Sequence, residues 1–208
     1  MNTRQAYNIW SQQYDSNNNK TRDLEAYALR TFLPNIYFGN CLEIGCGTGK
    51  NTEWLITKAK QITAVDLSED MLAKAKEKIS SSSIQFVQAD ITDSWTFAEN
   101  LFDLITFSLV LEHIQNLDHV FSEVSKYLLE AGHVYIGELH PFKQYNGTKA
   151  RFETAEGTQV VECFNHHISE FIQTAKKHRL AIVDINEYFD DGNNATIPRI
   201  LTLLLKKV

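Results

Sequence analysis

The sequence predicts an α/β domain built on a doubly wound, mostly parallel sheet. Strand and helix patterns alternate from residue 41 to about residue 140, which is typical of parallel βαβ units. A glycine-rich turn at residues 45–49 follows the first of these strands and leads into a helix, as in nucleotide-binding α/β folds. With 208 residues, 43% of them hydrophobic, the chain is large enough to bury the core of one such domain.

Two helical segments precede the sheet, at residues 3–14 and 22–33. Each repeats aromatic and apolar residues at spacings of three and four, which indicates amphipathic helices. Aromatic residues at these spacings are more often packing residues than ligand contacts.

Five apolar, β-branched segments are the expected parallel strands: 41–45, 61–66, 84–88, 102–109 and 133–139. They are too apolar for a solvent-exposed edge, as expected of a sheet covered on both faces. Between them, residues 72–79 and 117–128 show helical periodicity. Ser68 is the expected N-cap of the first helix, and Gly132 is expected where the second ends and a strand begins.

The pattern changes after residue 140. Residues 141–165 are polar, punctuated by glycine and without helical periodicity, so a loop or short hairpin is expected, and one of this length is usually functional or mobile. An amphipathic helix follows from 168 to 175. Segments 181–189 and 199–207 are expected as an antiparallel strand pair at one sheet edge. One domain is therefore expected, divided into 1–35, 36–140, 141–165 and 166–208.

Composition excludes several classes of protein. The net charge of −6 argues against a duplex-binding surface, which needs a basic face, and no apolar run approaches the ~20 residues of a membrane span. The first ten residues lack a signal-peptide core. Three cysteines and seven histidines occur without metal-ligand spacing, so no metal is expected. We expect a cytoplasmic monomer or homodimer with no nucleic-acid or membrane partner.

The segment Cys41–Gly49, CLEIGCGTG, carries the most information about a ligand. Asp66 ends the next strand, and an acidic residue about 20 positions after such a turn is placed to bind a ribose diol. A dinucleotide fingerprint would have glycine where Lys50 stands, and the spacing of a phosphate-binding P-loop is absent. Glu43 would repel a pyrophosphate and attract an amine. The expected ligand is therefore a nucleoside with a cationic, amino-acid-like end.

This pattern resembles motif I of the class I S-adenosylmethionine-dependent methyltransferases, of the type that acts on small molecules. The resemblance implies a seven-stranded Rossmann-like sheet, S-adenosylmethionine as cofactor and S-adenosylhomocysteine as product. It also implies a helical lid formed by residues 1–35, with a Tyr-Asp pair, here Tyr14-Asp15, folded over the cofactor. The cofactor-binding residues that it implies are Tyr14, Glu43, Gly45, Cys46, Gly47, Gly49, Asp66, Leu67, Met71, Asp90, Ile91, Ser108 and Leu109.

A catalytic base is needed only if the methyl acceptor must lose a proton. Histidine is the side chain whose ordinary pKa suits this role near neutrality. His140 is the favoured base, followed by His166 and then His113; Glu112, Glu138 and His167 are further candidates. The acceptor site is expected between the N-terminal helices, the loop at 112–113 and residues 140–167.

The expected acceptor is a small molecule, because the Asn/Asp-Pro-Pro-Tyr/Phe tetrapeptide of DNA amino methylases is absent after the fourth strand. Oxygen or nitrogen is the expected methylated atom, with sulfur and carbon left open. Two alternatives remain. One is a nucleotide-dependent oxidoreductase, which Lys50 and Glu43 disfavour. The other is an interaction protein that binds the cofactor without catalysis.

Overall fold

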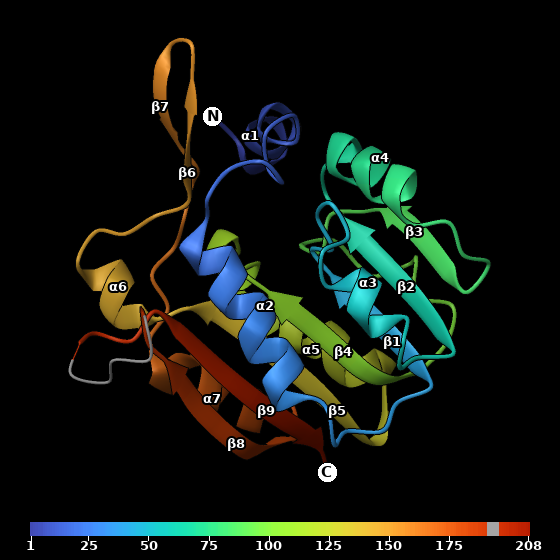
Figure 1. The fold of residues 1–208 in the computed structure, drawn as a ribbon. Helices are drawn as coiled ribbons and strands as arrows, with labels where there is room; N and C mark the ends of the chain where they lie inside the picture. Colours follow the sequence, from blue (N-terminus) through green and yellow to red (C-terminus); the bar gives the residue numbers. More distant parts are fainter. Residues whose placement is uncertain (191–195) are drawn as a thin grey trace.

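The computed structural model describes residues 1–190 and 196–208. Within them, the central feature is a seven-stranded sheet in the order β3-β2-β1-β4-β5-β9-β8 (Figure 1). Its strands are β1 (Asn40–Ile44), β2 (Gln61–Asp66), β3 (Ile84–Gln88), β4 (Phe102–Ser108), β5 (Leu128–Leu139), β8 (Leu180–Tyr188) and β9 (Ile200–Lys207). The first five are paired in parallel, and β9 is antiparallel to both β5 and β8. The prediction of a doubly wound, mostly parallel sheet with an antiparallel pair at its C-terminal edge is confirmed.

Helices cover both faces of the sheet. They are α1 (Thr3–Trp10), α2 (Lys20–Phe32), α3 (Thr52–Leu55), α4 (Glu69–Lys78), the 3-10 turn η1 (Leu111–His113), α5 (Leu117–Tyr127), α6 (Pro141–Tyr145) and α7 (Ile168–Lys177). In Figure 1, α2 and α3 lie in front of the sheet and α5 and α7 behind it. Leu29 of α2 packs in one buried cluster, and Phe121 of α5 and Phe171 of α7 pack in another. Burial on both faces explains why the central strands are so uniformly apolar.

Two boundaries differ from the prediction. Helix α1 ends at Trp10 and is followed by turns, so it is shorter than the expected 3–14. Gly132 does not end α5; it lies inside β5, which begins directly after Tyr127. The change from helix to strand is made by an irregularity early in β5, where Ala131 has a φ of 62° and the register with β4 shifts. The N-cap prediction is confirmed, because Ser68 Oγ accepts a hydrogen bond from Met71 N–H at 3.1 Å.

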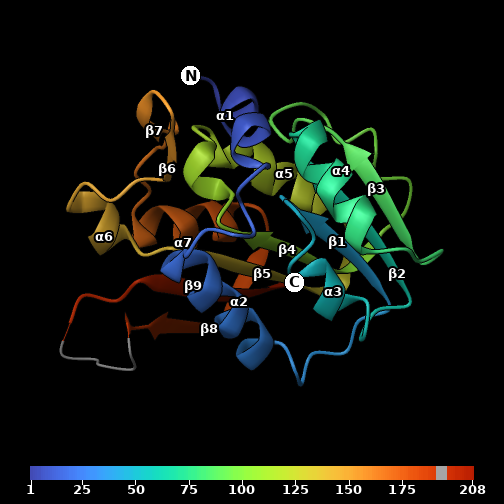
Figure 2. The same ribbon diagram turned by 45° about the horizontal axis from the view of Figure 1, so that its top comes forward.

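The segment between β5 and α7 forms α6 and a hairpin of β6 (Arg151–Thr154) and β7 (Gly157–Val160). The hairpin stands outside the main sheet, and α1 lies between it and α4 (Figures 1 and 2). A small buried cluster joins these pieces: Phe152 and Val161 at the base of the hairpin, Trp10 of α1 and Met71 of α4. The expected short hairpin is therefore present, and its base packs against the N-terminal helix α1.

Among the described residues, no helix has both the length and the apolar character needed to cross a membrane.

Candidate functional site

The glycine-rich turn joins β1 to α3 and uses its glycines for different purposes. Gly47 has a φ of 54°, and a Cβ built on it would meet no atom within 4 Å, so the backbone borders open space. Gly49, with a φ of 85°, instead faces α4, where an added Cβ would lie 2.7 Å from Ile79 Cδ1. Both positions have a positive φ, which favours glycine, and at Gly49 the close approach of Ile79 also leaves no room for a side chain. Gly49 therefore packs against α4 and does not line the cavities described below, contrary to its expected role as a cofactor contact.

A main cavity lies at the carboxyl ends of the parallel strands. It brings together ten of the expected binding residues: Tyr14, Gly45, Gly47, Asp66, Leu67, Met71, Asp90, Ile91, Ser108 and Leu109. Apolar side chains from β2–α4 and from the segment after β3 form two of its walls. This is the position where open α/β sheets bind ligands. The cavity has the chemistry expected for a flat, apolar ring joined to a sugar.

Asp66 is fixed at this cavity by the backbone. Its Oδ2 accepts a hydrogen bond from Gly47 N–H at 2.7 Å and its Oδ1 one from Ser68 N–H at 2.8 Å. Each carboxylate oxygen has two lone pairs, so both can still accept a bond from a ribose hydroxyl. Burial raises the pKa of Asp66 to about 6, although the neighbouring amides lower it. Asp90 lines the same cavity and also caps a local turn by accepting bonds from Thr92.

A second, polar recess continues from the main cavity past Gly45 and Ser108. It contains Glu43, Cys46 and Tyr14, as expected. It also contains Arg22 and Glu25 of α2, which were not among the expected binding residues. Arg22 and Glu25 are only 9% and 2% exposed. They occupy the apolar stripe of α2, at i and i+3 with Leu29 at i+7. A charged pair within an apolar stripe is the feature of the sequence that could have identified these two residues.

The recess combines two cations, Arg22 and Lys50, with two carboxyl groups, those of Glu43 and Glu25. Glu43 Oε2 accepts a hydrogen bond from Thr52 Oγ1 at 2.6 Å, and Glu25 accepts bonds from Asn51 and Tyr135. Burial raises the pKa of Glu43 to about 8 and that of Glu25 to about 7. Buried carboxyl groups without a cation are costly to ionise. The recess is therefore suited to a ligand with both an ammonium and a carboxylate group.

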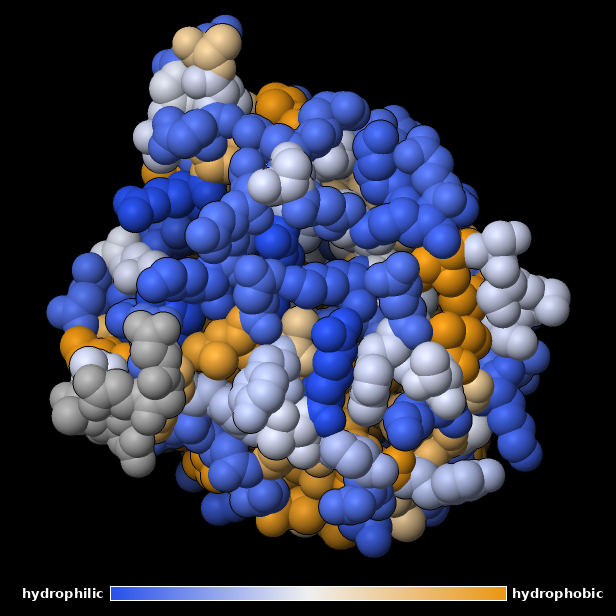
Figure 3. Space-filling model, in the orientation of Figure 1, coloured by the Kyte–Doolittle hydropathy of each residue, from blue (hydrophilic) through white to orange (hydrophobic). Residues whose placement is uncertain are grey.

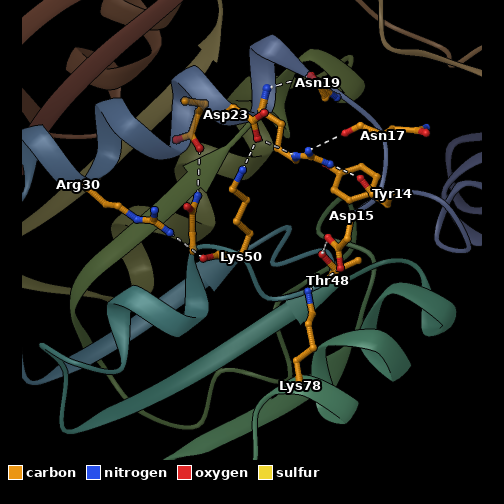
Figure 4. Close-up of polar contacts among 12 residues, drawn as sticks. Tyr14, Asp15, Asn17, Asn19, Asp23, Arg30, Thr48, Lys50 and Lys78 are labelled. Atoms are coloured by element: carbon orange, nitrogen blue, oxygen red, sulfur yellow. Dashed lines mark hydrogen bonds and ion pairs between the residues drawn. The ribbon is translucent and has the colours of Figure 1, made fainter.

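The N-terminal segment is tied down over these cavities, as Figure 4 shows. Asp15 accepts hydrogen bonds from Thr48 Oγ1 at 2.6 Å and from Lys78 Nζ at 2.7 Å, and thereby links the segment to the glycine-rich turn and to α4. Lys50 forms an ion pair with Asp23 of α2. The guanidinium group of Arg22 lies over the Tyr14 ring, 5.3 Å from its centroid. These contacts place Tyr14 at the junction of the main cavity and the recess.

A third cavity, of about 310 Å³, lies on the other side of Tyr14. It is bounded by α1, by residues 17–21, by residues 148–151 at the start of the hairpin and by Leu109 and Glu112. Tyr7, Tyr14 and Leu109 line both this cavity and the main one. Leu109 adopts a φ of 58°, which is uncommon for a residue with a side chain. The third cavity thus shares a wall with the main cavity.

Only one of the three histidines expected as bases lines these cavities. His113 borders the main cavity, where Nδ1–H donates to the Glu162 carbonyl oxygen at 2.7 Å and Nε2 lies 2.9 Å from the Tyr7 hydroxyl. A carbonyl oxygen can only accept, so the neutral ring carries its proton on Nδ1 and accepts from Tyr7. His113 therefore connects α1 to the loop after β4.

The positions of His140 and His166 correct the expected order of bases. His140 is fully buried and caps α6: its Nδ1 accepts from Phe142 N–H at 3.1 Å and its Nε2–H donates to Glu187 at 2.9 Å. His166 Nε2–H donates to the Ile114 carbonyl oxygen at 2.8 Å. Its Nδ1 lies 3.0 Å from Glu170 Oε1 without hydrogen-bond geometry. Neither side chain lines the three cavities, and both hold the protein framework.

Two buried glutamates support and line the loop after β4. Glu138 of β5 accepts hydrogen bonds from the backbone N–H groups of Val110 and Leu111 at 2.9 and 2.8 Å, and burial raises its pKa to about 8. Glu112 lines the third cavity and is 5% exposed. Its Oε2 has no hydrogen-bond partner among the described residues. Burial raises the pKa of Glu112, while His113 beside it lowers this pKa.

Metal chemistry has no evident site here. Within residues 1–190 and 196–208, no group of three or more histidine, cysteine, aspartate or glutamate side chains is arranged to hold a metal ion.

Comparison with known proteins finds similarity in both sequence and fold. Residues 42–136 match a family described as "Methyltransferase domain". The fold matches the crystal structure of the N-methyltransferase NodS from Bradyrhizobium japonicum WM9 in complex with S-adenosylhomocysteine, with a TM-score of 0.74 and 21% identity over 100% of this chain and 99% of that chain. Residues 42–136 are therefore similar to a methyltransferase domain, and the chain has the fold of an S-adenosylmethionine-dependent methyltransferase.

Two curated relatives are similar to this chain over part of their length. An uncharacterized protein of Haemophilus influenzae is 24% identical over 75% of this chain and 63% of its own length. A malonyl-[acyl-carrier protein] O-methyltransferase of Enterobacter lignolyticus is 31% identical over 55% of this chain and 44% of its own length. The chain thus spans less than two thirds of the length of these relatives.

The cavities of this chain fit S-adenosylmethionine, whose product S-adenosylhomocysteine is bound in the NodS structure. The main cavity offers the ribose acceptor Asp66 and apolar walls for the adenine. The recess offers Arg22 for the carboxylate and Glu43 and Glu25 for the ammonium group of the methionine end. The open space beside Gly47 lies between these two parts.

Affinity for S-adenosylhomocysteine is expected to rise between about pH 6 and about pH 8. Without ligand, the raised pKa values of Glu43 and Glu25, about 8 and about 7, keep these groups largely protonated at the lower pH. The ligand's ammonium group favours their ionised forms, so binding releases protons and becomes stronger as pH rises toward those pKa values. Calorimetry in two buffers of different ionisation enthalpy measures this release. Glu43→Gln should reduce it; an affinity that does not change with pH would contradict the role of both carboxyl groups.

Proposed function

We propose that this methyltransferase transfers the methyl group of S-adenosylmethionine to an oxygen or nitrogen atom of a small-molecule acceptor. The observation that carries the proposal is the third cavity. It shares Tyr7, Tyr14 and Leu109 with the main cavity, and it is also lined by Glu112, whose Oε2 has no hydrogen-bond partner among the described residues. Its volume of about 310 Å³ suits a small metabolite. The proposal concerns the activity of this chain and not that of its longer relatives.

The residues around the third cavity supply position and a proton acceptor. When bound, S-adenosylmethionine supplies an activated methyl group on a sulfonium with a good leaving group. Tyr14 and Leu109 border both cavities and hold the two reactants next to each other where the cavities meet. Alignment of this kind provides roughly 7–11 kcal/mol of rate acceleration. The acceptor atom would bond to the methyl carbon as the carbon–sulfur bond breaks and S-adenosylhomocysteine leaves, and the Glu112 carboxylate would accept the proton of the acceptor's O–H or N–H group. Its raised pKa makes it a stronger base than an exposed glutamate.

The N-terminal segment closes the site. Tyr7 contacts His113, and Asp15 contacts Thr48 and Lys78, so residues 1–35 act as a lid over the reacting groups. Residues 36–140 bind the cofactor, 141–165 shape the acceptor site and 166–208 complete the sheet. Closure excludes water, which strengthens the electrostatic interactions inside. The lid has to open for exchange of cofactor and product.

Turnover with a panel of metabolites tests the proposal. Formation of S-adenosylhomocysteine should depend on the acceptor, and mass spectrometry should find the added methyl group on an oxygen or nitrogen atom. An interaction protein that binds the cofactor would retain S-adenosylhomocysteine binding but show no acceptor-dependent turnover. An oxidoreductase would bind NAD in calorimetry. Either result would refute the proposed function.

A further inference from the structure

The third cavity has an unusual charge for this protein. Its lining contains four cationic side chains, Lys20, Lys149, Arg151 and Arg199, and among the described residues a single carboxyl group, that of Glu112. The chain as a whole has a net charge of −6. The cations come from three separate parts of the chain, so they do not result from one basic stretch of sequence. The fold gathers positive charge at this cavity.

Three of these cations, Lys20, Lys149 and Arg151, form no ion pair with a described residue, and the last two lie together on the hairpin side. Arg199 is neutralised by Asp190, to which its Nη2 donates a hydrogen bond at 2.6 Å, and its Nη1 also donates to Thr21. Lys149 and Arg151, by contrast, form no ion pair with any described residue, and both are exposed. Figure 3 shows that hydrophilic residues gather on this face, between the β6–β7 hairpin and α2. Positive charge is therefore available to a ligand on the hairpin side of the cavity.

A buried hydrogen-bond donor is also available there. Trp10 lines the cavity and is 5% exposed, and its Nε1–H has no hydrogen-bond partner among the described residues. Buried donors are nearly always paired in folded proteins, so an unpaired donor on a residue that lines a cavity is free to bond to an acceptor atom of a ligand. The rings of Tyr7, Trp10 and Tyr14 add an aromatic wall. The cavity thus combines an aromatic wall, an N–H donor and unpaired cations.

We infer that the methyl acceptor carries an acidic group, a carboxylate or a phosphate, which Lys149, Arg151 and the Trp10 N–H bind, on a body that lies against the aromatic wall. The inference rests on the proposed function, because it treats the third cavity as the acceptor site. It adds the chemical class of the acceptor. The acidic group lies toward the hairpin, while the atom to be methylated points toward Leu109 and Glu112.

Calorimetry with three probes of similar shape tests this inference: benzoate, phenyl phosphate and benzamide, each added to the full chain saturated with S-adenosylhomocysteine. Each charge-assisted contact that is lost costs roughly tenfold in affinity, so both anions should bind at least about tenfold more tightly than neutral benzamide. The stronger of the two anions identifies carboxylate or phosphate as the preferred group. Raising ionic strength from about 0.02 M to about 0.5 M should weaken the anions and leave benzamide unchanged, because salt screens exposed charges.

A double variant, Lys149→Gln with Arg151→Gln, should lose the preference for anions and keep its affinity for S-adenosylhomocysteine. Lys176→Gln is the matched control, because Lys176 is an exposed lysine on α7 that does not line the third cavity. Equal binding of benzamide and the anions, binding of no probe, or an anion preference that survives in the double variant would each overturn the inference. The salt series on the unmodified protein gives the same decision if the double variant does not fold.

The same experiments separate the two proposals. Turnover of neutral acceptors alone would overturn the acidic acceptor and leave the methyl transfer in place. An anion preference without turnover of any acceptor would overturn the methyl transfer and leave an anion-binding cavity.

Discussion

Gly47→Val is expected to weaken the binding of S-adenosylhomocysteine by at least ~100-fold, because a branched side chain is excluded from a left-handed backbone position and would project into the space of the ligand. Gly47 has a φ of 54° and borders open space between the ribose site at Asp66 and the methionine recess. Its N–H also holds Asp66 Oδ2, so a displaced backbone would move the ribose acceptor as well. Isothermal titration calorimetry measures the loss.

Gly147→Val is the matched control for this variant. Gly147 also has a positive φ, of 84°, and open space around its Cβ position, but it lies after α6 and does not line the main cavity or the recess. The backbone strain introduced is therefore similar in both variants, and only Gly47→Val should lose the ligand. If the two variants bound S-adenosylhomocysteine equally, the main cavity would not be the cofactor site.

Glu112→Gln is expected to lower turnover by ~10²–10⁴-fold, the range for removal of a general base, with nearly unchanged affinity for S-adenosylhomocysteine. Glutamine keeps the size and the hydrogen-bonding capacity of the side chain and cannot accept the proton. Burial raises the pKa of Glu112, so the turnover of the unmodified enzyme should fall as the pH drops through that raised pKa. The variant should lose this dependence. Steady-state kinetics over a pH series measures both effects.

Glu162→Gln serves as the control for a nearby carboxyl group, because Glu162 is exposed and contacts His113 through its backbone carbonyl oxygen. It should keep the turnover of the unmodified enzyme. Full activity of Glu112→Gln would show that the enzyme works by alignment alone or that the base lies elsewhere, with His113 the next residue to test.

Local patterns explain which features could be predicted from the sequence. The glycine-rich turn and Asp66 lie close together in the chain, separated only by α3 and β2. In a βαβ unit the ends of the two parallel strands lie at the same edge of the sheet, so the two features meet at the main cavity. The strands β1 to β5 were found because burial on both faces leaves continuous apolar segments. The last two strands were expected as an antiparallel pair at one sheet edge, but the insertion of β9 between β5 and β8 was not part of that prediction.

Features that depend on distant contacts were missed or misjudged. His140 directly follows β5, which favoured it as a base, but Pro141 begins α6 at that point and the His140 side chain turns to cap the helix. Arg22 and Glu25 are buried only because the glycine-rich turn and β5 approach α2. Glu112 became the strongest candidate base because its neighbours leave one carboxylate oxygen unpaired, which no pattern along the chain records.

The β6–β7 hairpin has a consequence for how enzymes of this kind diversify. Among the described residues it shares no strand pairing with the main sheet, and it is joined to the body through Phe152 and Val161. Arg151 begins β6 and Lys149 lies just before it, whereas the residues proposed to bind the cofactor lie at the ends of the parallel strands and on α2. Insertions, deletions or exchanges within residues 147–165 can therefore alter the choice of acceptor while the inherited cofactor machinery stays intact. Cofactor binding and the choice of acceptor can therefore evolve independently of each other.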